Sequence, residues 1–534
     1  VVDRPLDIDA GERIVVDEFE LIGVVDRPEA GISRGEIEAI VEERRAASSE
    51  GFTVGRLQEL ADEITRYYRE RGLILAQAFI PVQTVENGRV RLEVLEGQLG
   101  RVVAEGNEMY SEKVLQRPFG DLLGEPVAGG SAESALLQLT EYPGVTLFGV
   151  FQPGQRVGEA DMVIKVQEED RLELDVRADN HGIRETGQTR LRVDGRLNNP
   201  TGAGDRLTLT AQATEAPANS FFYAGEYERP IIAPGWLLRL GVNRNAFRVG
   251  GDFDDQDIGS ETYTLYSELS RSIIKSRQRN LSARAEFARK HSKTKVRGVD
   301  NTREDLAVLL LGVEYDSVDA RLAGLNAALL EYSRGFDDIL GAMGAQPAVV
   351  PPSRQGRDRQ FASGQFDKLF FSYSRLQSLT PLSEKLKHHS LLFRTEAQWS
   401  DDLLVPLEQY SIGGPNSVRA YQPTEFLSDR ALYASLEWII NAPGFADKPA
   451  QIFGNRTWGE IIQVSLFYDW AIGRLNSPLE DGITPENFSG AGIGISFSNP
   501  NSFSARLSVA QAIGRPRPEN AREPQYWFDL TLYF

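Results

Sequence analysis

The C-terminal two thirds of the chain consist of segments in which apolar and polar residues alternate. The last of these segments, Tyr526–Phe534, places five large apolar side chains on one face of an extended strand, with Asp529 and Thr531 on the other: Tyr526, Phe528, Leu530, Leu532 and Phe534. A period of two is typical of β-strands. One continuous apolar face that ends on Phe534 suits a lipid-facing strand, although a buried strand of a soluble β-sandwich would show the same pattern.

The same alternation recurs along the chain and decides between these two alternatives. Clear cases are residues 432–438, 462–470 and 502–509, in which apolar residues at every second position are separated mostly by polar ones. Segments of this length can cross a bilayer when the strand is tilted. We count roughly sixteen of them between Arg171 and Phe534, an even number, as bacterial barrels require. The pattern therefore predicts an all-β transmembrane barrel.

Composition limits the remaining possibilities. The 534 residues exceed one ordinary domain, and no apolar run of about 18 residues is present, which excludes membrane-spanning helices. The net charge of -19 argues against nucleic acid as a partner. The absence of cysteine suits an oxidising periplasm, and four histidines without cysteine provide little material for a metal site. We therefore expect no metal and no cofactor.

The N-terminal third follows a different pattern. Leu57, Leu60 and Ile64 lie at helical spacing, and Gly72 follows where a helix C-terminus favours positive φ. A strand is expected over Ala76–Val82, and Asn87-Gly88 is a hairpin signal before an alternating segment that reaches Val94. These features predict a small sheet with helices on one face.

A second unit of similar plan follows from Gly100. It is expected to contain a strand near residues 101–105, a helix that carries Leu136 and Leu139, and strands at residues 145–151 and 162–167. The break between the helix and the first of these last two strands is Pro143-Gly144. The sequence thus predicts two tandem α+β modules before the barrel.

Several motifs in this order resemble a known family. The first module resembles the first POTRA module of the two-partner secretion transporters, outer-membrane proteins of the Omp85 superfamily, in three motifs: Arg69–Leu73, Pro81–Gln83 and Val94–Gly97. Pro143-Gly144 and Pro153-Gly154 match the second module, and the segments from Asp179 to Asp205 resemble the start of the family's barrel. The resemblance implies an N-terminal extension at 1–12, POTRA modules at 13–98 and 99–170, and a barrel at 171–534.

One loop carries the most specific motif. Val418-Arg419-Ala420-Tyr421 falls between the eleventh and twelfth expected strands, in an outward-side loop, and is similar to the family's Val-Arg-Gly-Tyr motif. Taken alone, such a tetrapeptide is more often a surface loop. The resemblance implies that the loop folds back into the barrel lumen, where its partner is a Phe-x-Asp-x-Gly pattern, here the segment Phe467–Ala471.

The alternation of the strand supports this pairing independently. Tyr468 and Trp470 are expected to point outward, so Asp469 faces the lumen, where a guanidinium offers a planar, bidentate partner. Glu437 is expected on the lumen side as a second acceptor. Ala420 and Ala471 replace the glycines of the two motifs, and a methyl group on each side is expected to alter the docking of the loop against the wall.

The resemblance implies a protein exporter in the outer membrane of a Gram-negative bacterium, with the POTRA modules in the periplasm and no enzymatic activity. Its implied partners are outer-membrane lipid and one secreted exoprotein with an N-terminal secretion domain: an adhesin, a cytolysin or a contact-dependent toxin. Candidate receiving surfaces are a helix and a strand of the second module, carrying Leu136, Leu139, Val145, Leu147 and Phe148. Taken individually, each of those leucines is more typical of the module's core.

Alternatives and weaker signals remain. An insertase of the same superfamily is the alternative function, although it usually carries more POTRA modules; a barrel lipase or a passive porin fits less well. The acidic segment Gly251–Asp257 and the pair His388-His389 are expected to be a solvated loop and two opposite-facing side chains rather than metal sites. Residues 335–364 are expected to form a long mobile outer loop. A pore-plugging helix before the first module is not expected, because Pro5 and Gly11 interrupt that short segment.

Overall fold

The computed structural model describes residues 8–48, 50–215, 219–231, 233–344, 349–479, 486–520 and 522–534. The chain divides into two compact units, Val1–Glu169 and Asp170–Phe534. Most of the residues that precede the first module, 1–7, lie outside the described ranges, so the expected absence of a plug helix stays a prediction.

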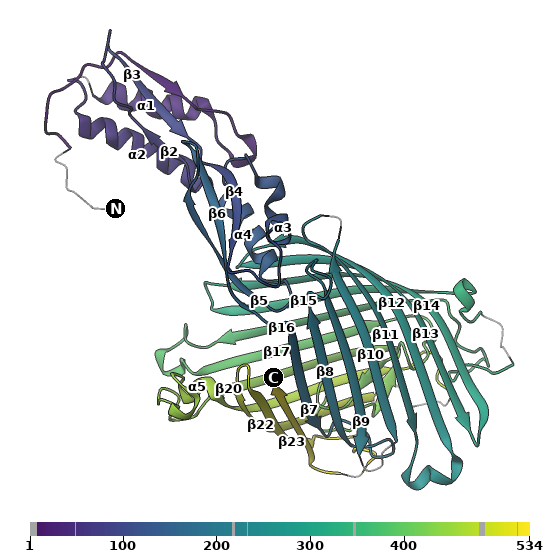
Figure 1. Ribbon diagram of the computed structural model, residues 1–534. Helices are drawn as coiled ribbons and strands as arrows, with labels where there is room; N and C mark the ends of the chain where they lie inside the picture. Colours follow the sequence, from purple (N-terminus) through teal and green to yellow (C-terminus); the bar gives the residue numbers. More distant parts are fainter. Residues whose placement is uncertain are drawn as a thin grey trace. The chain divides into compact units, whose positions relative to one another are not determined.

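The first unit begins with a small α+β module. Its elements are β1 (Glu18–Ile22), α1 (Arg34–Ala47), α2 (Val54–Glu70), β2 (Gln77–Phe79) and β3 (Arg89–Leu95), with the strands in the order β1-β3-β2. Helix α2 begins after Thr53, whose hydroxyl accepts a hydrogen bond from the amide of Arg56. Leu60 and Ile64 of this helix pack in the same core as Leu92 of β3. The helices thus cover one face of the sheet (Figure 1).

A second module repeats this plan. Its elements are β4 (Gln98–Glu105), α3 (Glu112–Gln116), α4 (Gly129–Leu139), β5 (Val145–Pro153) and β6 (Glu159–Glu169), with the strands in the order β4-β6-β5. In both modules the strand that comes last in the sequence, β3 or β6, lies in the centre of the sheet. It pairs in parallel with the first strand of its module and antiparallel with the second. The fold explains the tandem pattern in the sequence. Strand β5 lies at the edge of its sheet.

The motif at the end of β3 has a structural role. Glu96 accepts a 2.8 Å hydrogen bond from Arg27, and this bond raises the pKa of Arg27. Gly97 has φ +75°, and a Cβ at this position would stand 2.6 Å from Cβ of Leu75. The Glu-Gly pair therefore lets the chain turn from one module into the next at close range.

The second unit is a β-barrel. The described residues of this unit include sixteen strands that close into one antiparallel sheet: β7 (Leu172–Asp179), β8 (Thr189–Asn198), β9 (Arg206–Glu215), β10 (Ser220–Pro230), β11 (Trp236–Arg248), β12 (Ile258–Lys275), β13 (Arg279–Val296), β14 (Val299–Asp319), β15 (Gly324–Phe336), β16 (Phe366–Ser378), β17 (His389–Trp399), β20 (Arg430–Asn441), β21 (Ile462–Arg474), β22 (Glu486–Asn499), β23 (Phe503–Ala512) and β24 (Gln525–Tyr533). The predicted fold class and strand number are confirmed. No helix among the described residues is long and apolar enough to span a membrane.

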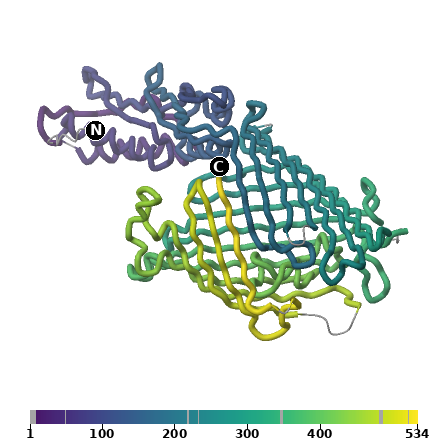
Figure 2. The backbone as a smooth tube through the Cα atoms, turned by 60° about the horizontal axis from the view of Figure 1, so that its bottom comes forward, coloured from purple at the N-terminus to yellow at the C-terminus, as the bar shows by residue number. Residues whose placement is uncertain are grey.

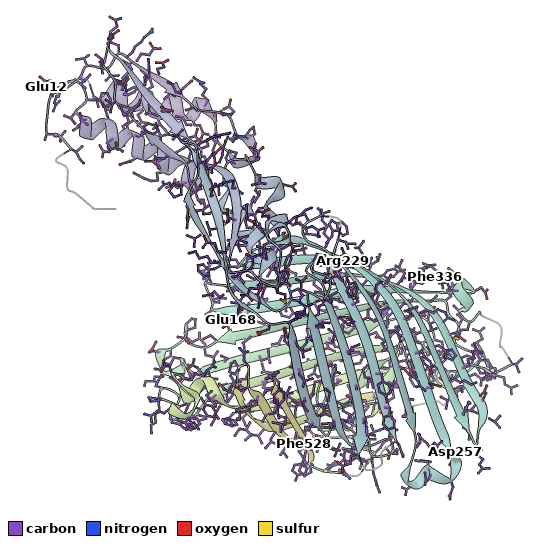
Figure 3. All side chains as sticks on the ribbon, viewed as in Figure 1. Glu12, Glu168, Arg229, Asp257, Phe336 and Phe528 are labelled. Atoms are coloured by element: carbon purple, nitrogen blue, oxygen red, sulfur yellow. The ribbon has the colours of Figure 1, made fainter. Side chains whose placement is uncertain are left out.

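The direction of the first strand, β7, defines the two ends of the barrel. We call the end at which β7 begins the near end and the end at which it finishes the far end. Arg229 marks the near end, and Asp257 and Phe336 mark the far end (Figure 3). The acidic segment Gly251–Gln256 forms an exposed 3-10 turn at the far end, as expected for a solvated loop.

The barrel closes between its first and last strands, β7 and β24, which lie side by side (Figure 2). Their backbones pair at five positions only, from Asp175↔Tyr533 to Asp179↔Asp529, and Phe534 extends the ladder by exchanging two hydrogen bonds with Leu174. The side chain of Phe534 is exposed, in agreement with the outward position that the alternation predicts for it.

Beyond Asp529 the seam continues through Asn180, whose main-chain amide donates a 3.3 Å hydrogen bond to the carbonyl of Phe528. Its side chain adds two more bonds. The side-chain amide of Asn180 donates a 2.7 Å hydrogen bond to the carbonyl of Tyr526 and accepts one of 2.8 Å from the amide of Phe528. The side chain thus satisfies two groups of β24 that would otherwise bond to a longer neighbouring strand. Asn180 thus lengthens the seam between the first and last strands.

The segment that joins β15 and β16 is partly held in place. Met343, Ala362 and Phe366 pack against Leu306 of β14 and Leu404 of the next far-end loop. Ser353 also donates a hydrogen bond to Glu304. These contacts correct the expectation of a mobile loop for the residues that make them, whereas residues 345–348 lie outside the described ranges.

Candidate functional site

The loop with the Val-Arg-Ala-Tyr motif lies at the tip of a small hairpin between β17 and β20. Strands β18 (Tyr410–Ile412) and β19 (Phe426–Ser428) pair with each other and project the loop between them. Gly413 has φ +102°, and a Cβ there would stand 2.2 Å from the carbonyl oxygen of Gln422. Within the loop, the amide of Gly414 donates to the carbonyl of Tyr421. The tip is therefore a tight turn that requires glycine.

Arg419 is the most heavily bonded side chain of this loop. Its Nε and Nη2 donate hydrogen bonds of 2.8 and 2.7 Å to the two oxygens of Asp469, and its backbone amide adds a third of 3.1 Å. Nη1 donates to Glu437 at 2.8 Å. The guanidinium lies 3.3 Å from the ring centroid of Phe467. The structure thus brings together the arginine and the three partners that the sequence pattern placed on the lumen face.

The site is buried and its charges are balanced. Arg419 is 2% exposed and Asp469 is 0% exposed. Glu437 is also bound by Arg506 of β23 at 3.0 Å, so two arginines meet two carboxylates. Ser435 donates a 2.8 Å hydrogen bond to Asp469. A buried ion pair of this kind holds its geometry because breaking it would strand a charge in a low-dielectric environment.

Two further contacts fix the loop to the last strands. The indole Nε1 of Trp527 on β24 donates a 2.7 Å hydrogen bond to the carbonyl of Arg419. The hydroxyl of Tyr421 donates one of 2.8 Å to the carbonyl of Pro516, and its ring packs edge-on against Phe488 at 5.2 Å. The loop therefore spans the lumen from β20 and β21 to β24.

Both alanines that replace motif glycines are buried: Ala471 pairs in register with Phe488 of β22, and Ala420 faces a glycine of the same strand. A Cβ on Gly490 of β22 would stand 2.4 Å from Cβ of Ala420, and Gly490 pairs in register with Asp469. Gly492 leaves similar room for the ring of Phe467. Sequence reasoning missed Gly490, Gly492 and Trp527. The glycines could have been found from their spacing, because alternate positions of one strand face the lumen together.

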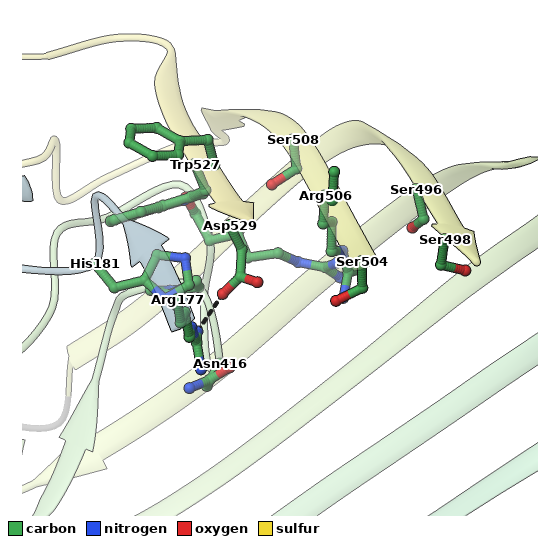
Figure 4. A pocket seen from close by; sticks show the side chains of 14 residues that line it. Arg177, His181, Asn416, Ser496, Ser498, Ser504, Arg506, Ser508, Trp527 and Asp529 are labelled. Carbon is green, nitrogen blue, oxygen red and sulfur yellow. Dashed lines mark hydrogen bonds and ion pairs between the residues drawn. The ribbon is translucent and has the colours of Figure 1, made fainter. Parts of the chain in front are cut away.

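A cavity of about 360 Å³ lies beside the docked loop. Arg177 and His181, near the end of the first strand, face Asp529 and Trp527 of the last strand across it (Figure 4). Its polar lining also includes Asn416 of the loop, Arg506 and several serines of β22 and β23.

Three groups in this region, of which His181 and Asp529 line the cavity, have a geometry that could hold a metal ion: Asp179, His181 and Asp529. However, arginines already pair with both carboxylates, since Arg190 binds Asp179 at 2.7 Å and Arg177 binds Asp529. We therefore propose no metal here. His388 and His389 have separate partners, Asp447 and Trp438, and do not act together.

The hairpin is also tied down at the far end of the barrel. Buried Glu408, just before β18, binds Lys290 of β13 at 2.6 Å and Lys368 of β16 at 2.7 Å. Burial raises the pKa of Glu408, but the charges and hydrogen bonds of the two lysines lower it further, so the net shift is downward. The carboxylate thus stays charged between two cations.

Asp429, just before β20, joins three far-end segments. Its fully buried carboxylate accepts hydrogen bonds from the amides of Leu404 and Asn476 and from Arg354. These residues come from the loops before β18, after β21 and before β16. The far-end loops therefore form one packed layer around the base of the hairpin.

Comparison of the sequence with known protein families identifies the family of this chain. The family described as haemolysin secretion/activation protein ShlB/FhaC/HecB matches residues 158–453, more than half of the chain. The chain belongs to this family. The ShlB-type POTRA domain matches residues 30–97, within the first module. The transporter is thus an outer-membrane β-barrel protein with periplasmic POTRA structure, and the near and far ends of its barrel are periplasmic and extracellular.

Individual relatives agree with this assignment. The heme/hemopexin transporter protein HuxB of Haemophilus influenzae is 24% identical over 495 residues, which cover 90% of this chain and 81% of HuxB. The haemolysin transporter protein ShlB of Serratia marcescens is 24% identical and covers 71% of this chain and 65% of its own. Such relatives support a secreted exoprotein as the partner of this transporter.

Solved structures share the fold. CdiB from Escherichia coli superposes with a TM-score of 0.76 at 18% identity, covering 98% of this chain and 91% of CdiB. BamA from Haemophilus ducreyi lacking POTRA domains 1–3 gives a TM-score of 0.55 at 13% identity, covering 98% and 100%. At these identities the likeness concerns the fold alone.

The predicted receiving surface of the second module needs correction. Leu139, Val145 and Leu147 are buried in the module's core, so their side chains are not available to a partner. Leu136 is partly buried against the same core, whereas Phe148 is 43% exposed. Helical or strand periodicity does not distinguish a core face from a binding face. The surface predicted from the sequence therefore contains residues of both kinds.

Proposed function

We propose that this transporter receives a single unfolded exoprotein at its second POTRA module and passes it through the barrel. The observation that carries the proposal is the Arg419 loop, which occupies the lumen of a closed barrel through non-covalent contacts only. A chain that crosses the barrel has to displace this loop or pass beside it. The loop is therefore the element on which transport depends.

The receiving surface that we propose is the free edge of β5. An extended chain can add to such an edge through main-chain hydrogen bonds, while its side chains contact the adjacent face. Phe148 and Val150 are exposed on that face, at alternate positions of the strand. Leu136 borders the opposite face, where a Cβ on Gly149 would touch it. This surface suits an apolar, extended segment rather than a folded domain.

We infer that transport uses no nucleotide and that the protein has no catalytic step. The sequence contains no phosphate-binding Gly-rich loop of the type Gly-x4-Gly-Lys-Ser/Thr. Folding of the exoprotein outside the cell is the proposed driving force, because a folded domain cannot slide back through the barrel. The exoprotein is expected to be an adhesin, a cytolysin or a contact-dependent toxin with an N-terminal secretion domain.

The experiment that tests this proposal compares cells with and without the gene. Secreted and outer-membrane proteins are quantified by mass spectrometry in both strains and after complementation with the wild-type gene. We expect one large exoprotein to disappear from the medium or the cell surface while other barrel proteins persist. That protein would be the partner.

Two results would contradict the proposal. A parallel decrease of many barrel proteins would identify an insertase, the alternative within the superfamily. An unchanged set of proteins in both fractions, under conditions in which the transporter is present in the outer membrane, would exclude an export function.

A further inference from the structure

A groove lies on the outside of the barrel, at the extracellular ends of β16, β17, β20 and β21. Its volume is about 490 Å³, within the range of roughly 300–1,000 Å³ that is typical of ligand pockets. Its apolar lining projects from four neighbouring strands: Leu369, Phe371, Ala397, Trp399, Leu432 and Ile472. The groove thus faces the membrane and not the lumen.

Two arginines form the rim of this groove. Arg430 of β20 and Arg474 of β21 are paired in register, and both belong to the outward-facing set of their strands. In such a pair the Cβ atoms lie about 4.5–5.5 Å apart, and like charges directly opposite each other are destabilising. An arrangement of this kind favours an anion near both guanidinium groups.

The two guanidinium groups differ in their partners. Arg430 donates a 2.9 Å hydrogen bond to the carbonyl of Ser400, pairs with Asp401 and lies over the ring of Trp399 at 4.2 Å. Exposed Arg474 has no side-chain hydrogen bond or ion pair in the part of the chain that the structure describes. One cation at the rim is therefore free to bind a ligand.

The position of the groove in the membrane identifies the kind of ligand. Trp399 is 56% exposed at the end of its strand, where aromatic side chains of barrels mark the boundary between hydrocarbon and headgroups. The apolar lining extends from this level toward the hydrocarbon, while the arginines stand at the level of headgroups. The geometry matches a molecule with acyl chains below and an anionic group above.

We propose that this groove binds a phosphorylated acyl lipid of the outer leaflet, with the acyl chains against Leu369, Phe371 and Leu432 and the phosphate between Arg430 and Arg474. Arginine suits this role because its planar donors bind phosphate oxygens in pairs. The inference rests on the outer-membrane location of the barrel and is independent of which exoprotein is secreted.

The probe for this site is lipid A, which carries both acyl chains and phosphates. The purified full-length chain is titrated in detergent with bisphosphorylated lipid A and with the same lipid after enzymatic dephosphorylation, and bound lipid is counted by native mass spectrometry. We expect the wild type to bind the phosphorylated form at least tenfold more tightly. Arg430→Gln with Arg474→Gln should abolish that preference.

A matched control separates a specific site from surface charge. Arg334 of β15 also points outward near the extracellular end, but it already pairs with Asp367 at 3.5 Å. Arg334→Gln should leave lipid binding unchanged, and Ala397→Trp, which fills the groove, should weaken binding of both lipid forms. Heat-dependent gel mobility confirms that each variant is a folded barrel.

Two outcomes would overturn the proposal. One is equal binding of the phosphorylated and dephosphorylated lipids by the wild type. The other is a loss of binding in Arg334→Gln as large as in the double variant of Arg430 and Arg474, which would identify non-specific attraction to surface arginines.

Discussion

A side chain on Gly490 would stand 2.4 Å from the Cβ of Ala420, so the alanine of the lumen loop fits only because its neighbour on the barrel wall is glycine. In the family pattern the corresponding loop position is a glycine. In this chain the loop residue, Ala420, carries a methyl group, and the facing residue of β22, Gly490, has no side chain. The loop can therefore still approach the wall closely. Asp469, which pairs in register with Gly490, remains within reach of Arg419.

This relationship predicts the effect of exchanging the two residues. Gly490→Ala should weaken loop docking by about 1–3 kcal/mol, because overpacking forces the loop away from the wall. Adding Ala420→Gly should restore docking by removing the facing methyl group. The unfolding midpoint of each purified variant, followed by heat-dependent gel mobility, provides the measurement. Gly195→Ala on β8 is the control, because a Cβ there has nothing within 4 Å.

Arg419 is expected to dominate the energy of docking. Arg419→Ala leaves Asp469 buried without its cation, whereas Glu437 keeps Arg506. Loss of one partner of a buried pair costs about 3–5 kcal/mol. Pore conductance in planar bilayers should increase as the loop leaves the lumen. Arg419→Lys should behave nearly as badly, because lysine cannot bind both oxygens of Asp469 in a fork.

Arg184 provides the comparison for this prediction. It is an exposed arginine of the loop after β7, and Arg184→Ala should retain the wild-type conductance. A wild-type conductance in Arg419→Ala as well would mean that the other contacts hold the loop without the guanidinium.

Trp527 is predicted to couple the loop to the last strand. Trp527→Phe keeps an aromatic ring beside His181 but removes the donor to the carbonyl of Arg419. Leaving that buried carbonyl unsatisfied should cost about 1–3 kcal/mol, measured as a lower unfolding midpoint. Trp470→Phe, on the outward face of β21, should have a much smaller effect. Equal shifts in the two variants would argue against the coupling.

The far-end layer should loosen in acid. The pKa of Glu408 lies below its ordinary value of 4.5, so its ion pairs are complete above pH 4.5 and are lost as the pH falls through the lowered value. A spin label on Pro406→Cys, an exposed position two residues away, reports the change as increased mobility below pH 4.5. The chain has no native cysteine to interfere.

Glu408→Gln tests whether this carboxylate is responsible. It leaves Lys290 and Lys368 facing each other without an anion, so the label should be mobile already at neutral pH. A pH profile identical to that of the wild type would assign the acid transition to another group.

Phe148 is predicted to contribute to capture of the exoprotein. Burying a phenylalanine contributes about 1.5–3 kcal/mol, so Phe148→Ser should reduce binding of an exoprotein fragment by about tenfold or more. Secretion in complemented cells and affinity of the purified modules are the two measurements. Val82→Ser, at a fully exposed position of the first module, is the control. An equal loss of exoprotein binding in both variants would indicate non-specific hydrophobic binding.

The sequence predicted the barrel and the Arg419–Asp469 pair for the same physical reason. Strand residues alternate between two faces, so the outward positions of Tyr468 and Trp470 placed Asp469 in the lumen without any knowledge of the fold. The resemblance to the family then supplied the loop that reaches it. Pattern and motif together were sufficient because each contact partner lies on a regular strand.

Contacts that depend on closure of the barrel were not predictable in this way. Trp527 meets Arg419 only because the last strand returns to the first, and no local pattern indicates that approach. The sequence offers Leu139 and Leu147 both as core and as binding positions, because burial and recognition require the same apolar spacing. In both cases tertiary packing decides what local periodicity leaves open.

The side-chain amide of Asn180 makes the seam between β7 and β24 depend on the identity of one residue. Elsewhere in the barrel neighbouring strands are joined by main-chain groups, which are the same whatever the side chains are. Where β24 passes Asn180, two of the three hydrogen bonds come from its side chain and are therefore subject to substitution. A single substitution at this position can thus shorten the hydrogen-bonded seam and leave the rest of the sheet unchanged. The stability of barrel closure can therefore vary through one side chain.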